Sequence, residues 1–252
     1  MSWLDSLLGR STTPATPDPD GALLRCTNLH LTRGHFHLHI PELTVFPGTV
    51  TGLVGPNASG KSTLLETLVG LRPSADGSAR VLGLNPHTDG PRIREAVALT
   101  SDHTPVRRGR IRDVLANQAR FYPSWDATLE AQLLERFQLH PDTRVESLST
   151  GQTTRFRLVQ ALAWKPRLVL LDEPGLGLDL TQRRALFTTV LDIVADPTRA
   201  VVISSHQLAD LERMVDHLAV LADGSCVRQG PIDDLVSDDL TLEEALLRWG
   251  AA

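Results

Sequence analysis

This sequence of 252 residues has few cysteines, no long hydrophobic run and no surplus of positive charge. The two cysteines, Cys26 and Cys226, lie far apart along the chain. This spacing favours a reducing cytosolic setting and packing in the core over a disulfide framework. No apolar run approaches the roughly 20 residues that a membrane-spanning helix needs, and residues 1–10 lack the pattern of a signal peptide. Any association with a membrane is therefore expected to depend on a partner.

The charged residues comprise 25 Lys and Arg against 30 Asp and Glu, which gives a formal net charge of −5. Proteins that bind nucleic-acid backbones usually carry a basic surplus, so this balance disfavours nucleic acid as a main partner. A hydrophobic content of 41% with 22% charged residues is ordinary for a globular protein. The length allows one large domain or two small ones.

One segment matches G-x-x-x-x-G-K-[ST], the pattern of a phosphate-binding loop. Its residues are Gly55, Pro56, Asn57, Ala58, Ser59, Gly60, Lys61 and Ser62, and Thr63 follows directly. The two fixed glycines let the backbone turn so that successive N–H groups point at phosphate oxygens. Lys61 is expected to reach the β- and γ-phosphates, and the Ser62 hydroxyl is expected to ligate Mg²⁺.

The residues on both sides of this loop fit that interpretation. Residues 49–54 predict a buried strand, and residues 62–69 predict a helix that ends at Gly70. The phosphates would then lie at a helix N-terminus, where unpaired N–H groups and the helix dipole favour negative charge.

A second buried strand is expected at residues 168–171, and it ends in Asp172 and Glu173. An all-apolar strand is typical of a sheet covered on both faces, and ligands of α/β sheets bind at the carboxyl ends of the strands. Asp172 is therefore placed to hold Mg²⁺, and Glu173 to orient or deprotonate the attacking water.

The remaining pattern predicts an α/β fold with a mostly parallel sheet. Residues 23–45 alternate in polarity, as antiparallel strands do, and helices are expected at 111–122 and 127–139 as an insert. His35, His37 and His39 would share one strand face. Such a trio could bind a metal ion, although a solvated strand edge is the commoner case.

The segment Leu148, Ser149, Thr150, Gly151 and Gln152 precedes a helix expected to reach about residue 164, and Ser149 is a natural N-cap. With the phosphate loop before it and LVLLDEP about twenty residues after it, the order of motifs resembles the ATP-binding-cassette (ABC) ATPases. Gly177-Leu178-Asp179 resembles the D-loop of that family, and His206 resembles its switch histidine. The resemblance extends from Leu23 to about Leu235.

This resemblance implies an ATPase that uses ATP and Mg²⁺ and works as a head-to-tail dimer. Each ATP would lie between the phosphate loop of one subunit and the signature segment, residues 148–152, of the other. Ser149 and Gly151 would contact the γ-phosphate, with Thr150 and Gln152 in the same segment. His206 would also reach the γ-phosphate, and Asp179 would reach across the interface. The fold implied is a P-loop NTPase core with an N-terminal antiparallel β subdomain and a helical insert.

Several positions depart from the family pattern. Thr150 replaces the first glycine of the usual LSGGQ signature, and Ala58-Ser59 replaces Gly-Ala or Gly-Cys in the phosphate loop. The Q-loop glutamine is missing, and Asp102 aligns best with its position as a contact to metal or water. His35 or Phe36 would take the place of the aromatic residue that stacks on adenine.

Three features resemble bacterial exporters whose membrane subunits are separate chains. They are the compact insert with its motif at residues 121–126, the segment 144–148 and the tail at 242–247. This likeness implies a peripheral location at the cytoplasmic face of the membrane, a permease partner that docks between Asp102 and Trp125, and a second cassette that is identical or closely related. A regulatory nucleotide-binding cassette with little turnover is the alternative, and the intact Glu173 disfavours it.

The expected organisation has three parts. Residues 1–20 form an N-terminal extension with a proline-rich linker, and residues 21–236 form the ATPase domain with a helical subdomain at about 104–150. Residues 237–252 form a C-terminal helix.

Overall fold

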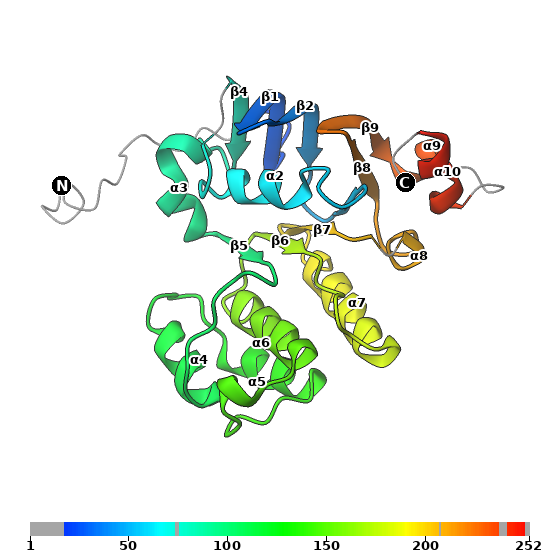
Figure 1. The fold of residues 1–252 in the computed structure, drawn as a ribbon. Helices are drawn as coiled ribbons and strands as arrows, with labels where there is room; N and C mark the ends of the chain where they lie inside the picture. The colour runs from blue at the N-terminus through cyan, green and yellow to red at the C-terminus, as the bar shows by residue number, and fades with distance from the viewer. Residues whose placement is uncertain (1–17, 74–75, 207, 237–240, 250–252) are drawn as a thin grey trace, which may run out of the picture.

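The computed structural model describes residues 18–73, 76–206, 208–236 and 241–249. Within these residues, nine strands form one sheet in the order β4-β1-β2-β9-β8-β3-β7-β6-β5 (Figure 1). The strands are β1 (Leu24–Arg33), β2 (Phe36–Val45), β3 (Val50–Val54), β4 (Asp76–Val81), β5 (Val97–Thr100), β6 (Leu168–Asp172), β7 (Ala200–Ser204), β8 (His217–Ala222) and β9 (Ser225–Pro231).

Two kinds of strand pairing divide the sheet. Strands β8, β3, β7, β6 and β5 run parallel, which aligns their carboxyl ends at one edge. Strands β4, β1 and β2 are antiparallel, and β9 pairs antiparallel with β8. A single parallel bridge between His39 and Ser225 joins the two parts. The expected mostly parallel sheet with an antiparallel N-terminal part is therefore confirmed.

The helices of the described residues lie beside the sheet and in a separate lobe. They are α2 (Lys61–Leu68), α3 (Pro86–Arg94), α4 (Ile111–Ala119), α5 (Ala127–Arg136), the 3₁₀ turn η1 (Val145–Ser147), α6 (Thr150–Leu162), α7 (Leu180–Val194), α8 (Leu208–Leu211), α9 (Ile232–Leu235) and α10 (Leu242–Arg248). Figure 1 shows α4, α5 and α6 grouped below the sheet, with α7 beside them. Helices α4 and α5 correspond to the two helices expected in the insert, whereas α6 follows the expected end of the insert and groups with them.

The central strands form because their sequences are apolar and both sheet faces are covered. Every residue of β3, β6 and β7 is buried, as expected of parallel strands inside an α/β fold. Apolar residues pack into two clusters, one around β1, β2 and α2 and the other around the helical lobe and α7. The core thus fixes the strand ends from which the functional residues project.

The predicted elements differ from the structure at a few boundaries. Helix α4 ends at Ala119, before residue 122 where it was expected to end, and α5 ends at Arg136, before the expected residue 139. Helix α3 was missed because Gly90 and Pro91 mask its pattern, although Asn85 caps it by accepting a hydrogen bond from the backbone N–H of His87. The proposed N-terminal extension lies outside the described residues up to residue 17.

In the part of the chain that the structure describes, no helix has the length and apolar character to cross a membrane.

We expect Leu170→Ala to destabilise the protein by about 2–5 kcal/mol, because it leaves a cavity in a fully buried central strand. Chemical denaturation monitored by circular dichroism measures this change. Leu191→Ala is the matched control, since Leu191 is 49% exposed on α7, and its effect should stay within about 0.5 kcal/mol. Equal effects of the two substitutions would contradict the placement of β6 in the core.

Candidate functional site

The phosphate loop joins the end of β3 to the start of α2, and its glycines occupy positions that other residues could not. Gly55 has a φ of 145°, and a Cβ atom there would lie 2.0 Å from the carbonyl oxygen of Leu221. Gly60 has a φ of 111° and would bring a Cβ atom within 3.0 Å of Phe36. Both values fall where L-residues are rare, so the sequence pattern has a steric basis here.

Lys61 begins α2 and turns its side chain back over the loop. Its ammonium donates hydrogen bonds to the carbonyl oxygens of Gly55 at 2.8 Å and Pro56 at 3.1 Å. The ammonium also lies 4.0 Å from Oε1 of Glu173. Burial lowers the pKa of Lys61, while the charges of Glu173 and Asp172 act in the opposite direction. The loop therefore holds a cation at the edge of the sheet, beside two carboxylates.

Other atoms of the loop are suited to an anion. The Ser59 hydroxyl is buried and has no hydrogen-bond partner within the described residues. Ser62 is exposed in the first turn of α2, and Asn57 and Ala58 are exposed at the tip of the loop. An orphaned donor beside free helix N–H groups fits a phosphate ligand, so the residues present suit the nucleotide that the pattern predicts.

The two carboxylates at the end of β6 are tied to β7 through Ser204. Its hydroxyl, which is fully buried, donates a 2.7 Å hydrogen bond to Oδ1 of Asp172 and accepts a 2.9 Å bond from the backbone N–H of Glu173. Glu173 has a φ of 48°, an uncommon left-handed conformation for a non-glycine residue. Ser204 therefore fixes the position of Asp172 and the turn at Glu173.

His206 lies next to Glu173 in the same cluster. Its Nδ1 is 2.7 Å from Oε2 of Glu173, and its backbone N–H donates to the same oxygen at 3.4 Å. The His206 side chain is 46% exposed. The structure thus brings together Lys61, Asp172, Glu173 and His206, all of which were expected from sequence. It also adds Ser204, which was not singled out from sequence.

The signature segment and the D-loop lie side by side within one chain. A Cβ atom on Gly151 would come within 2.8 Å of the carbonyl oxygen of Gly177. Ser149 caps α6 in a capping box with Gln152, so the expected N-cap is confirmed, and Asp179 caps α7 in the same way with Gln182. Ser149, Thr150 and Asp179 are exposed.

The two candidate adenine contacts differ in position. Phe36 begins β2, is half-buried and lies beside Gly60 of the phosphate loop. His35 is exposed in the turn between β1 and β2. The position of Phe36 makes it the better candidate of the pair.

Asp102 lies in an exposed turn after β5. Its Oδ1 lies 3.5 Å from Nδ1 of His103, and its charge acts on Arg157. This turn follows Thr100, which is paired with Leu171, one residue before Asp172. Asp102 therefore lies at the same sheet edge as the carboxylates, in the neighbouring strand connection.

The histidine trio does not share one strand face as expected, because His35 lies in the turn. His39 instead stacks on His30 of β1, with ring centroids 4.3 Å apart. Among the described residues, no group of three or more His, Cys, Asp or Glu side chains could hold a metal ion. Cys26 and Cys226 are free thiols, and burial raises the pKa of Cys26 to about 12.

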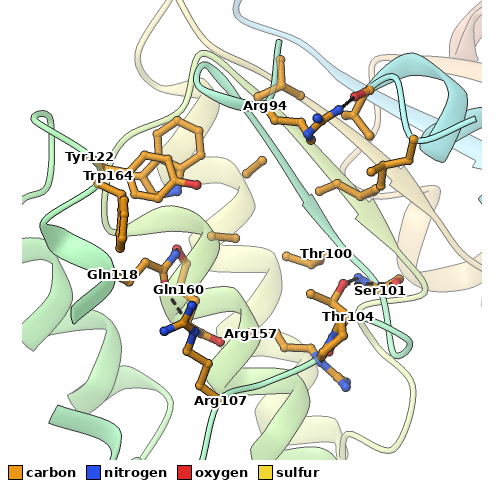
Figure 2. A pocket seen from close by; sticks show the side chains of 18 of the residues that line it. Arg94, Thr100, Ser101, Thr104, Arg107, Gln118, Tyr122, Arg157, Gln160 and Trp164 are labelled. Carbon is orange, nitrogen blue, oxygen red and sulfur yellow. Dashed lines mark hydrogen bonds between the residues drawn. The ribbon is translucent and has the colours of Figure 1, made fainter. Parts of the chain in front are cut away.

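A groove of about 700 Å³ separates the helical lobe from the sheet domain. Figure 2 shows the Tyr122–Trp164 pair on one side of it and Ser101 and Thr104 on the other. The lining also includes the exposed Phe121 and Leu71. Sequence reasoning placed a partner contact between residues 102 and 125, but the contributions of α2, α3 and α6 could not be read from sequence.

Several known proteins are similar to this chain in sequence. The ATP-binding protein YtrB of Bacillus subtilis is 28% identical over 81% of this chain and 70% of its own length. A Nod factor export ATP-binding protein of Neorhizobium galegae is 31% identical over 76% of this chain and 56% of its own. The manganese transport ATP-binding protein MntA of Synechocystis is 30% identical over 78% of this chain and 79% of its own length.

Solved structures agree with the fold. A structure described as the ATP-binding subunit of an ABC transporter is 26% identical, has a TM-score of 0.81, and is matched over 90% of this chain and 99% of its own. CbiO1 of Clostridium perfringens, described as part of the complex cbiONQ, has a TM-score of 0.73 at 18% identity over 90% of this chain and 95% of its own, which supports the fold alone.

The family described as ABC transporter matches residues 38–175, more than half of the chain, including the phosphate loop, the signature segment and both carboxylates. The relatives that match at least two thirds of their own length are ATP-binding proteins of transport systems. The chain therefore belongs to the ABC transporter ATP-binding family, and it is an ATPase that binds ATP.

Proposed function

We propose that this chain is the ATP-hydrolysing subunit of a membrane exporter, and that two cassettes close head to tail around two ATP molecules to drive separate permease subunits. The observation that carries the proposal is the cluster of Lys61, Asp172, Glu173 and His206 at one sheet edge, held by the buried Ser204. A cation, two acids and an imidazole beside a phosphate loop are the groups that phosphoryl transfer to water needs.

In this proposal the phosphate loop binds the β- and γ-phosphates of ATP. Lys61 leaves the carbonyl oxygens of Gly55 and Pro56 and reaches the phosphates, and the Ser59 hydroxyl gains the partner that it lacks within the described chain. Phe36 stacks on the adenine ring, since it lies beside Gly60. Thr63 lies in the first turn of α2 beside the same phosphates.

Ser62 and Asp172 would hold Mg²⁺, which neutralises phosphate charge when bound. Hydroxyl and carboxylate oxygens are hard ligands, and Mg²⁺ usually takes only one or two protein groups while keeping several waters. The lack of a larger ligand cluster among the described residues is compatible with this mode of binding.

Glu173 is the proposed general base. It would accept a proton from the water that attacks the γ-phosphorus atom, while His206, hydrogen-bonded to Glu173, contacts the γ-phosphate. Ser204 fixes the Glu173 backbone, so that the carboxylate is positioned before the substrate arrives.

The exposed signature segment supports the dimer. Ser149 and the N-terminus of α6 present a second anion-binding surface that has no phosphate in its own chain. In a head-to-tail pair this surface would meet the γ-phosphate bound by the other cassette, with Asp179 reaching across. ADP lacks that phosphate and would release the pair.

The exporter direction, the permease partner and a peripheral location at the cytoplasmic face of the membrane belong to this proposal. The Nod factor export protein is similar over 76% of the chain and supports export, while MntA, a manganese transport protein, is similar over 78% and supports transport in general. The groove beside Asp102 to Trp125 is the proposed permease contact. A purely regulatory cassette is disfavoured because Glu173 and its hydrogen-bonded partners are intact.

We expect Glu173→Gln to lower kcat about 10²–10⁴-fold with little change in ATP affinity, because it keeps the size of the side chain and removes the base. Steady-state ATPase assays and nucleotide titrations measure the two quantities. Glu135→Gln, an exposed change on α5, is the control. Turnover of Glu173→Gln within a few-fold of wild type would show the base assignment to be wrong.

Lys61→Ala should weaken ATP binding by at least about tenfold, because the charge-assisted contact to phosphate is lost. Isothermal titration calorimetry gives the dissociation constant. The chain has one other lysine, Lys165, which pairs with Asp126 at the surface, and Lys165→Ala should leave the constant unchanged. Unchanged affinity in Lys61→Ala would refute the phosphate role of this loop.

Ser204→Ala tests the positioning role of the buried hydroxyl. It leaves Asp172 Oδ1 and the Glu173 N–H without their shared partner, so we expect kcat to fall by at least about tenfold and stability by about 1–3 kcal/mol. ATP affinity should change little. A fall in kcat without a loss of ATP affinity would show that the two acids are misplaced while the binding site is intact. Ser78→Ala, an exposed change on β4, is the control. An unchanged kcat in Ser204→Ala would overturn the positioning role of the Ser204 hydroxyl.

A further inference from the structure

We propose that Glu212 is a positioning residue for ATP hydrolysis. Its carboxylate fixes α10 against α8, and this packing holds His206 in its contact with Glu173. The inference rests on the proposed function, because it takes His206 to act on the γ-phosphate beside the general base. It adds the support of the imidazole, which comes from a helix that starts 30 residues after Glu212 in sequence.

His206 is held from two sides, and only one of them is the catalytic cluster. Within the described residues, its backbone N–H and its Nδ1 both lie against Oε2 of Glu173, while its side chain is 46% exposed. It lies between β7, which ends at the buried Ser204, and α8, which begins at Leu208. The strand end is fixed by the sheet, so the position of the imidazole depends on what holds α8.

Helix α8 covers four residues, too few to be stable through its own backbone hydrogen bonds. Its stability therefore comes from packing. Leu211 at its end is buried, as are Met214 and Val215 in the turn that follows. Cγ1 of Val215 lies 3.2 Å from the position of a Cβ atom on Gly52, in the strand that leads to the phosphate loop. One side of this segment thus packs on β3.

Helix α10 packs on α8. Leu242, Ala245 and Leu246 form one face of α10, and this face is buried. Leu242 and Leu246 belong to the same apolar cluster as Leu211, and the two helices are in contact. Figure 1 shows α8 and α10 at the end of the sheet domain that carries β8 and β9. The apolar face of α10 therefore completes the surroundings of α8.

Glu212 joins the two helices by a directed contact. Its own backbone N–H donates to the carbonyl oxygen of Leu208 at 3.0 Å, so it continues the turn of α8. Its Oε1 accepts a 3.2 Å hydrogen bond from the backbone N–H of Leu242, the first residue of α10. The capping box of α10 uses the N–H groups of Thr241 and Glu244. Glu212 thus binds a helix-start donor that this box leaves over, where the helix dipole also favours a carboxylate.

This contact defines one position for α8, whereas apolar packing alone is not directional. Without it, α8 can shift on α10, and His206 can leave its 2.7 Å contact with Glu173. A displacement of about 1 Å is enough to slow a reaction severely. ATP binding should be retained, because β3 is paired on both sides, with β7 and β8.

The first experiment observes the imidazole of His206. The full chain is labelled with ¹⁵N-histidine, and NMR records the ring nitrogens of its nine histidines; the His206 signal is the one missing in His206→Ala. We expect Glu212→Ala to shift or broaden this signal and to leave those of the stacked His30 and His39 unchanged. An unchanged His206 signal would overturn the inference, since a general loss of stability does not move one imidazole of the folded protein.

The second experiment measures turnover. We expect Glu212→Ala to lower kcat about tenfold with little change in the dissociation constant for ATP. Glu212→Gln should keep kcat within about twofold of wild type, because its amide oxygen still accepts from Leu242. Asn85→Ala is the matched control, since Asn85 accepts from a helix-start N–H on α3. It should lower the thermal unfolding temperature as a lost cap does and leave kcat unchanged.

The outcomes separate this inference from the proposed function. An unchanged kcat in Glu212→Ala, an equal loss in Asn85→Ala, or an equal loss in Glu212→Gln refutes the role of Glu212 even when Glu173→Gln abolishes turnover as expected. Glu212→Asp, whose shorter side chain draws the carboxylate back from α10, replaces Glu212→Ala if that variant does not fold, with the same expected losses. A wild-type chain that hydrolyses no ATP refutes the proposed function instead, and the His206 signal then decides the role of Glu212.

Discussion

The hydrogen bond from the buried Ser204 hydroxyl to Asp172 is the contact on which the site depends. It joins the carboxyl ends of β6 and β7, and the same hydroxyl holds the backbone of Glu173 in an uncommon left-handed conformation. The parallel pairing of β3, β7 and β6 then places these acids beside Lys61. Three strands and one hydroxyl thus hold a cation and two carboxylates close together. In an unfolded chain the two carboxylates would repel each other, and all three groups would lie far apart.

The groups proposed to contact ATP lie on two separate surfaces of the chain. The phosphate loop and the acids lie on the sheet domain, whereas Ser149 caps the N-terminus of α6 in the helical lobe and Asp179 caps the N-terminus of α7. Each surface offers N–H groups at a helix start, which favour negative charge. This division supports the proposed dimer, because one nucleotide would contact a surface from each subunit.

Features that depend on local sequence were predictable. Three such features are determined by residues adjacent in sequence: the phosphate loop, the apolar run before Asp172 and the N-cap at Ser149. Helix α3 was missed because Pro91 and Gly90 are poor helix formers, and its cap and packing override them. Ser204 could not be found in this way, since its role arises only when the ends of β6 and β7 meet in the sheet.

The most direct test of the central claim is the mass of Glu173→Gln with saturating MgATP, measured by light scattering after size-exclusion chromatography. The account predicts a particle of twice the chain mass with ATP and a single chain with ADP, because only ATP offers a γ-phosphate to the second surface. A single chain under both conditions, with Ser149 still open to solvent when the membrane partner is bound, would contradict it.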